Sequence, residues 1–396
     1  MMRKYIILIV MPFILAACVK EKDDTGVMTA RQEVYDFMKE RYLWSDMIPE
    51  VKISDFKNFQ DLFDALIYKP ADKWSYISES SEYYLKKAFK GFGFTLKPDK
   101  NNKPAIATIN TESDLYTKGV RRGWILVTVD GTMVAPLLSQ DDTDGLSKLI
   151  ETSNTGETKN FEFLRPDGSR VYITAASKSL PQESLMVCDT LHLSSGIAGY
   201  LVFDDFRFVT NVVLDTTIDY LTACGINDLV VDLRYCSEGS FASIRYFSSI
   251  IAGNEHHGEC WIKLLDNNSA SQEIDFLMTG HTLGLRRVVF ITSGATSGYS
   301  EMMIYGLKSY TGVTVVGSRT AGNPYYMEGH AVFVKNESYY IDIMAVVAEA
   351  RNKDGGTGFT NGITADIEAA DDLNHDFGDR REECLAAAIS SLEGNQ

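Results

Sequence analysis

Two serines that flank a glycine are the residues best able to do covalent chemistry in this sequence. Ser297 and Ser300 lie on either side of Gly298, and Glu301 follows directly. A serine hydroxyl attacks a carbonyl carbon when a neighbouring base takes its proton, which is the chemistry of peptide and ester hydrolysis. The same residue types suit the first turn of a helix, where their oxygens accept hydrogen bonds from free N–H groups. Both interpretations stay open from the sequence.

Three other residues could serve such a reaction. His330 and Lys308 are conceivable proton acceptors, but helical spacing puts Lys308 about two turns beyond Ser300, which is too far for contact. His330 fits an ordinary polar residue of a loop or strand equally well. Cys236 could be a thiol nucleophile, although nothing near it in the sequence indicates an activated thiolate.

The cysteines do not form a metal-binding pattern. Apart from Cys18, the chain has Cys188, Cys224, Cys236, Cys260 and Cys384, with no CxxC spacing. Zinc sites in proteins bring such ligands together at short, regular spacings, so we expect no metal site and no cofactor. Free cysteines are usually buried, and the sequence favours buried thiols without choosing a disulfide pair.

Composition and charge limit the class of protein and of partner. The 396 residues are enough for two or three domains. Hydrophobic residues make up 45% and charged residues 23%, which excludes a disordered or coiled-coil chain. The formal net charge of -16 argues against nucleic acid as a partner, because binding to phosphates requires clustered Lys and Arg.

The first residues have the pattern of a secretion signal. Arg3 and Lys4 precede an apolar run over 5–15, which is too short to span a bilayer comfortably. The following Leu15-Ala16-Ala17-Cys18 resembles the lipobox of bacterial lipoproteins. That resemblance implies a signal peptide over 1–17, acylation of Cys18, a lipidated tether over 18–28 and a cell-envelope location, on the periplasmic or surface face of the outer membrane. An ordinary secretory signal is the alternative.

Three segments of different character follow the tether. Helical spacing of apolar residues predicts a helical N-terminal domain over 29–90. Short β-rich runs separated by turn signals predict a β-rich domain over 91–180. Alternating apolar strands and helices, among them a helix over 241–252, predict an α/β core over 181–396. The fold class is therefore α+β with several domains.

The β-rich segment is similar to a PDZ domain. It opens with Gly91-Phe92-Gly93-Phe94, where two glycines let successive N–H groups turn toward one anion. The run KGVRRGWILVTVDG over 118–131 resembles the PDZ hallmark, with Trp124 where an aspartate is usual. PDZ domains bind extended peptides by strand addition and often hold a terminal carboxylate. The alternative is a PDZ-shaped spacer whose groove is blocked.

The order of these segments, with several spaced motifs, resembles the C-terminal processing peptidases, also called tail-specific proteases. The motifs are Trp74-Ser75-Tyr76-Ile77, Asp232-Leu233-Arg234-Tyr235, Ile291-Thr292-Ser293 ahead of Ser300-Glu301, the run over 315–322 and the run over 361–366. The resemblance implies a crotonase-like layered peptidase core.

Family chemistry is peptide hydrolysis by a serine nucleophile and a lysine base, with backbone N–H groups that stabilise the oxyanion. By motif position the nucleophile would lie three residues before Glu301, which is Gly298, and the lysine would be Asn323. The oxyanion turn would be Cys236-Ser237-Glu238-Gly239, where the charge of Glu238 opposes an oxyanion. Gly298 has no hydroxyl, and the amide of Asn323 is not a useful base.

The sequence therefore predicts a lipid-anchored protein that binds peptides or protein C-terminal segments with little or no hydrolysis. One alternative is an active serine peptidase that uses a displaced Ser297 or Ser300. Another is a structural component of an envelope complex with both clefts filled. The oligomeric state and the peptide bound stay open.

Overall fold

The computed structural model describes residues 25–79, 88–140, 142–152, 154–181, 184–207, 210–237, 239–335, 339–355 and 358–394. The predicted signal peptide 1–17 and Cys18 lie outside these residues. Helix α1 begins at Thr25, so the last residues of the predicted tether, 25–28, belong to this helix.

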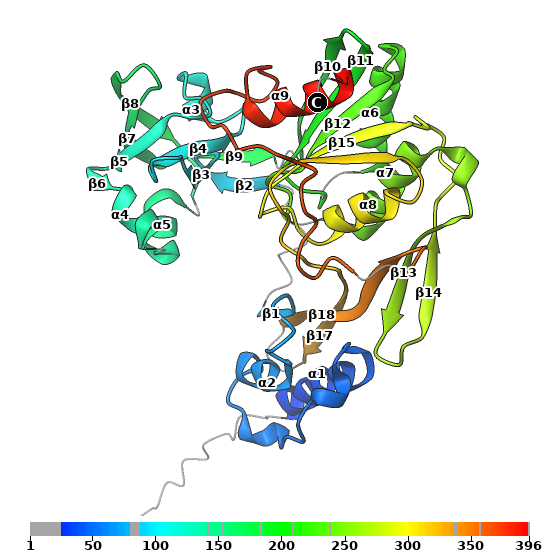
Figure 1. The fold of residues 1–396 in the computed structure, drawn as a ribbon. Coiled ribbons are helices and arrows are strands. Elements are labelled where there is room, and N and C mark those ends of the chain that lie inside the picture. Colours follow the sequence, from blue (N-terminus) through cyan, green and yellow to red (C-terminus); the bar gives the residue numbers. More distant parts are fainter. Residues whose placement is uncertain are drawn as a thin grey trace, which may run out of the picture.

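A six-stranded sheet lies at the centre of the α/β core (Figure 1). Its first strand is antiparallel to the second, and the remaining pairs are parallel. In spatial order the strands are β10 (Leu185–Leu193), β11 (Gly196–Phe203), β12 (Asp228–Asp232), β15 (Arg287–Thr292), β16 (Gly312–Gly317) and β19 (Ile367–Glu368). Every residue of β12 is buried, as expected for a strand covered on both faces.

Helices cover both faces of this sheet. One apolar core joins it to α6 (Asn211–Ala223), α7 (Phe241–Ala252) and α8 (Tyr299–Leu307), and a second core joins its other face to α9 (Glu383–Glu393). Thr210 and Ser240 cap α6 and α7, because each side chain accepts a hydrogen bond from a free N–H of the first turn. The predicted helix over 241–252 is present at those bounds.

The N-terminal helices share their core with a long hairpin that comes late in the sequence. Helices α1 (Thr25–Arg41) and α2 (Phe59–Leu66) pack on β17 (Tyr325–Val334) and β18 (Tyr339–Asn352). Single 3₁₀ turns lie at Ser45–Met47 and Ile53–Asp55, and another follows α7 at Asn254–His256. The helices therefore have no core of their own, which the prediction of a separate helical domain over 29–90 missed.

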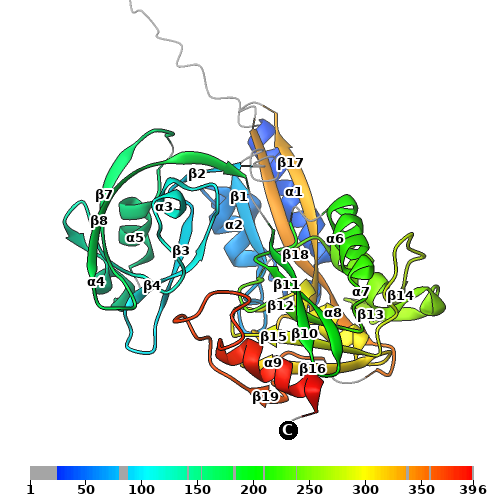
Figure 2. The ribbon, with the colours of Figure 1, turned by 90° about the horizontal axis from the view of Figure 1, so that it is seen from above.

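Strands also occur inside that predicted helical segment. Strand β1 (Tyr76–Glu79) pairs with β18, and β18 continues to β13 (Cys260–Asp266) and β14 (Ser271–Asp275). Strand β2 (Ala88–Gly91) pairs with β9 (Lys178–Pro181). Strand β1 runs along one edge of the β17–β18 hairpin, and helix α1 packs against the hairpin (Figure 2).

The residues between β2 and β9 form a separate β-rich unit, which Figure 1 shows to one side of the core. Its sheet surrounds an apolar cluster in which Phe92 and Phe161 stack edge to face. The strands are β3 (Phe94–Pro98), β4 (Pro104–Ile109), β5 (Ile125–Val129), β6 (Thr132–Met133), β7 (Thr158–Leu164) and β8 (Arg170–Ala176). The helices are α3 (Asp114–Thr117), α4 (Ala135–Ser139) and α5 (Thr143–Ile150).

Within the described ranges no helix combines the length and the apolar character needed to cross a membrane. The five cysteines of these ranges form no disulfide, and Cys236 and Cys384 are buried. The same residues contain no group of three His, Cys, Asp or Glu side chains placed to hold a metal ion.

Candidate functional site

A cavity of about 580 Å³ lies where the core meets the β1–β18–β17 sheet. The N-terminal end of α8 lines it through Ser297 and Gly298, and the turn after β16 lines it through Asn323. Gly239, from the turn after β12, lines it as well. Four residues that the sequence singled out, on three separate motifs, therefore come together on one surface.

Gly298 and Asn323 are neighbours in the wall of this cavity. A Cβ atom built on Gly298 would meet only one neighbour within 4 Å, which is Nδ2 of Asn323 at 3.5 Å. Gly298 has φ 61° and ψ −121°, a backbone conformation that costs other residues about 1–3 kcal/mol. Position 298 therefore has room for a side chain, but its backbone strains any residue except glycine.

The carboxylate of Glu301 holds both positions in place. It is fully buried, and its Oε2 accepts the N–H of Gly298 at 3.0 Å and the N–H of Asn323 at 2.8 Å. Its Oε1 accepts the N–H of Gly322 at 2.8 Å and the hydroxyl of Thr320. Burial raises the pKa of Glu301, while these four hydrogen bonds act in the opposite direction. One side chain thus joins the start of α8 to the turn that carries Asn323.

The two serines that could replace the nucleophile are poorly placed. Ser300 is 2% exposed, does not line the cavity, and donates its hydroxyl to Sγ of Cys236 at 3.1 Å. Ser297 does line the cavity, but its Oγ is enclosed and has no hydrogen-bond partner. A serine nucleophile must contact a base, and neither hydroxyl does so here.

The predicted oxyanion turn lies directly against this loop. The carbonyl of Cys236 accepts the N–H of Ser297 at 3.1 Å. Gly239 approaches Phe206 so closely that a Cβ would lie 2.7 Å from that of Phe206, which explains the glycine. Glu238, whose charge was predicted to oppose an oxyanion, lies outside the described residues.

The two candidate bases lie elsewhere. His330, on β17, stacks on the ring of Phe37 and its Nε2 lies 3.1 Å from a carboxylate oxygen of Glu33, on helix α1. Lys308 is exposed at the far end of α8. Neither side chain lines the cavity, so the structure does not support the idea of a base at either position.

Most of the cavity wall was missed by the sequence analysis. It is apolar and aromatic, from β1, α8 and the hairpin, with one cation, Arg207, held by two hydrogen bonds to Asp205. The motif around Trp74 gave the one available signal. The wall residues are Trp74, Tyr76, Tyr299, Tyr325, Met327 and Met344.

Comparison with known families decides the affiliation. Residues 30–76 match the family model "Peptidase S41 N-terminal domain", and residues 197–369 match "Peptidase family S41". Together the two matches take up more than half of the chain. The chain belongs to peptidase family S41. This assignment confirms the resemblance to C-terminal processing peptidases that the sequence motifs indicated.

Solved structures agree with this S41 assignment at the level of the fold. A candidate S41 protease of Bacteroides fragilis is 20% identical with a TM-score of 0.75, over 92% of this chain and 97% of that one. The photosystem II D1 C-terminal processing protease is 15% identical with a TM-score of 0.54, and the match covers 87% of this chain and 93% of that one. Mature CPAF complexed with lactacystin is 10% identical with a TM-score of 0.54, and the match covers 93% of this chain and 97% of that one. The predicted α+β fold of several domains with N-terminal helices is confirmed.

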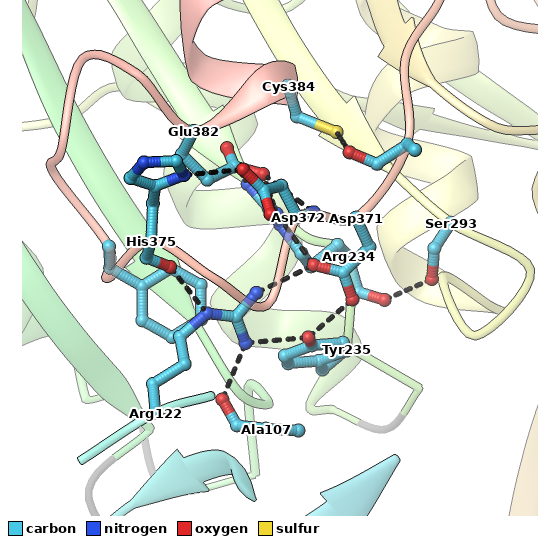
Figure 3. A network of polar contacts seen from close by, with 12 residues as sticks. Ala107, Arg122, Arg234, Tyr235, Ser293, Asp371, Asp372, His375, Glu382 and Cys384 are labelled. Atoms are coloured by element: carbon cyan, nitrogen blue, oxygen red, sulfur yellow. Dashed lines mark hydrogen bonds and ion pairs between the residues drawn. The ribbon is translucent and has the colours of Figure 1, made fainter. Parts of the chain in front are cut away.

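A polar network joins the β-rich unit to the S41 core (Figure 3). Arg122, 1% exposed, donates to Oδ1 of Asp371 at 2.6 Å and to the carbonyl of Ala107 at 2.6 Å. Arg234, equally buried, donates to the same Asp371 oxygen at 2.9 Å and to both carboxylate oxygens of Glu382. Burial alone would raise the pKa of Asp371, but the two guanidinium groups hold it below its usual range.

This network ends at the loop that leads to the cavity. The hydroxyl of Ser293 donates to the carbonyl of Arg234, and the N–H of Ala295 bonds back to that hydroxyl oxygen. Ala295 lines the cavity. The Asp-Leu-Arg motif at the end of β12 therefore supports both the junction with the β-rich unit and the loop next to Gly298.

The loop Gly91-Phe92-Gly93-Phe94 lines a second cavity, of about 610 Å³, between β3 and the end of α5. Gly93 has φ 78°, and a Cβ there would lie 2.6 Å from Leu180. The ring of Phe92 is buried in the core of the unit, so this residue offers its backbone rather than its side chain. The four predicted residues therefore lie together, away from the Gly298 cavity.

Proposed function

We propose that this S41 chain binds extended peptides or protein C-terminal segments in the Gly298 cavity without hydrolysing them. The facing pair of Gly298 and Asn323 carries the proposal, because that pair supplies neither a hydroxyl nor an amine. Among the described residues that line the cavity there is no lysine, histidine, aspartate or glutamate to take a proton. The apolar wall and the neutral amide of Asn323 suit a side chain and a backbone amide of a bound peptide.

The size of the rate loss expected without a serine nucleophile supports peptide binding rather than peptide hydrolysis. Loss of a serine nucleophile lowers the turnover of a serine protease about 10⁶-fold and leaves roughly 10³–10⁴ over water. Such a residual rate is negligible for a peptidase.

The second cavity extends this proposal to the β-rich unit. A PDZ-like domain would hold an extended segment along β3 and its terminal carboxylate at the turn 91–94. The positive φ of Gly93 supports this assignment, because such turns aim successive N–H groups at one anion. Lys148, on the α5 side of the cavity, adds a cation suited to a carboxylate.

We further propose that the protein is a lipoprotein of the cell envelope, acylated at Cys18. Two or more acyl chains are needed for stable anchoring. Labelling cells with a radioactive fatty acid tests this: the full chain should be labelled, and the Cys18→Ala variant should be neither labelled nor found with membranes. Equal labelling of the two would contradict it.

The main test incubates the purified chain, without its signal peptide, with unstructured peptides. We expect binding in the micromolar range by fluorescence anisotropy and no new fragments by mass spectrometry. A Tyr325→Ala variant should bind more weakly because it removes part of the aromatic wall, while a variant at exposed Tyr172 serves as the matched control.

Two outcomes would contradict the proposal. Cleavage that disappears in Ser297→Ala would make the chain an active peptidase that uses a displaced serine. Failure of every peptide to bind either cavity would favour a structural component, whose clefts other proteins fill.

A further inference from the structure

One oxygen of a buried carboxylate has no hydrogen-bond partner, two residues along β18 from the wall of the Gly298 cavity. Asp342, on β18, is 8% exposed, and its Oδ2 is enclosed and accepts no hydrogen bond. None of the cationic side chains in the described ranges forms a salt bridge with it. An ionised carboxylate in such a place normally has a cation or several N–H donors as partners.

Strand register puts Asp342 on the same face of the sheet as the cavity. Met344, which lines the cavity, is two residues along β18 from Asp342, and alternate residues of a strand share a face. The neighbouring strand repeats this step, because Tyr76, also in the cavity wall, pairs with Met344, and Ser78 pairs with Asp342. The intervening Ile343 faces the opposite side, in the core shared with α1 and α2.

The same face continues outward to two exposed rings. Ala331 lies opposite Asp342 on β17, and the next pair on this face is Phe333 with Tyr340. The two rings are 4.9 Å apart and 47% and 42% exposed. The face thus runs from the cavity, past Asp342, to an exposed aromatic pair at the end of the hairpin.

We propose that Asp342 is a specificity-determining residue that binds a lysine or arginine side chain of the bound peptide, two positions from the residue in the cavity. This rests on the proposed function. Side chains of an extended peptide that are two positions apart point the same way and are separated by about 6.5–7 Å. That distance matches the step from Met344 to Asp342, so one peptide can place an apolar side chain in the cavity and a cation at Asp342.

The raised pKa of Asp342 is consistent with a carboxyl whose cationic partner comes from a ligand. Burial raises the pKa of this carboxyl, and no positive charge among the described residues opposes that effect. A ligand cation would supply the missing charge. The Asp342→Asn variant should therefore fold at least as stably as the natural chain.

The experiment uses twelve-residue peptides of Gly and Ser with one central phenylalanine. One set has lysine two positions before or after the phenylalanine, a second has glutamine there, and a third has lysine directly adjacent to it. Fluorescence anisotropy measures their dissociation constants with the natural chain, Asp342→Asn and Glu349→Gln. Glu349 lies on the same strand outside the cavity lining, so its variant removes an equal charge and controls for general attraction to an acidic protein.

We expect one of the two lysine peptides with the two-position spacing to bind about fivefold or more tightly than its glutamine counterpart. This advantage should be lost in Asp342→Asn, kept in Glu349→Gln, and absent for adjacent lysine. Equal binding of lysine and glutamine peptides would overturn the role of Asp342 and leave the proposed function intact. If no peptide of any set binds, the proposed function itself fails.

Discussion

The Cβ atom that Gly298 lacks would lie 3.5 Å from Nδ2 of Asn323. The two positions face each other at a distance where a hydroxyl and a base could meet, yet they hold a hydrogen atom and an amide. Both backbones donate to the same oxygen of Glu301, so the frame around them stays fixed without the reactive groups. The position of both backbones therefore depends on Glu301 and not on their own side chains.

Replacing Gly298 with alanine should destabilise the chain. The φ of 61° at Gly298 strains any residue with a Cβ, and we expect a loss of about 1–3 kcal/mol in the free energy of unfolding. Urea unfolding measures it. Gly294→Ala is the matched control, since Gly294 lines the same cavity, lacks a positive φ, and has only the Arg319 carbonyl at 4.0 Å. Equal stability of Gly298→Ala and the natural chain would contradict the strain.

Introducing a serine at position 298 and a lysine at position 323 should create some reactivity. The double variant Gly298→Ser, Asn323→Lys places a hydroxyl and an amine on facing positions, and general-base catalysis contributes about 100-fold or more over the serine alone. We expect labelling by a fluorophosphonate at position 298, and slow cleavage of bound peptides, seen by mass spectrometry. Each single variant is the control and should be nearly inert. A folded double variant that binds peptides but is not labelled would show that the facing geometry is insufficient.

Local patterns predicted α/β elements, and motif positions singled out Gly298 and Asn323, because both kinds of inference depend on short stretches of sequence. Helix α7 was predicted at its observed bounds, and Gly298 and Asn323 followed from their distances to Glu301 and Gly322. The cavity wall could not be predicted in this way. Tyr76 meets Met344 only because β1 pairs with β18, a contact between distant parts of the chain that no local periodicity encodes. The shared core of α1 and the hairpin was missed for the same reason.

Changing Glu301 to glutamine should loosen the cavity and lower stability together. The amide keeps one acceptor oxygen but presents an NH₂ group to N–H donors, and each buried donor left without a partner costs about 1–3 kcal/mol. We expect a loss of at least about 2 kcal/mol by urea unfolding and weaker peptide binding. Ser300→Ala, one residue away, removes only the hydroxyl contact to Cys236 and should lose less. If both variants matched the natural chain, Glu301 would not be what holds Gly298 and Asn323.

The junction between the β-rich unit and the core should weaken in acid. The pKa of Asp371 is lowered by Arg122 and Arg234, and that of Glu382 is lowered by its hydrogen bonds to Arg234, in both cases against burial. A depressed pKa stabilises the folded state at any pH above the ordinary carboxyl range of about 4, and this contribution disappears as pH falls through the folded-state value. Urea unfolding between pH 7 and pH 2 should therefore show stability falling below about pH 4.

The Asp371→Asn variant tests which group carries that pH dependence. At pH 7 it removes the carboxylate that Arg122 and Arg234 share. Arg234 keeps its ion pairs with Asp232 and Glu382, so the cost falls mainly on Arg122, and breaking a buried pair costs about 3–5 kcal/mol. Because the variant has no carboxyl to protonate at this position, its stability should fall less steeply with acid, and the two curves should converge at low pH. Asp55→Asn, at an exposed pair with Lys52, controls for general charge and should shift stability far less. Parallel curves for Asp371→Asn and the natural chain would place the acid sensitivity elsewhere.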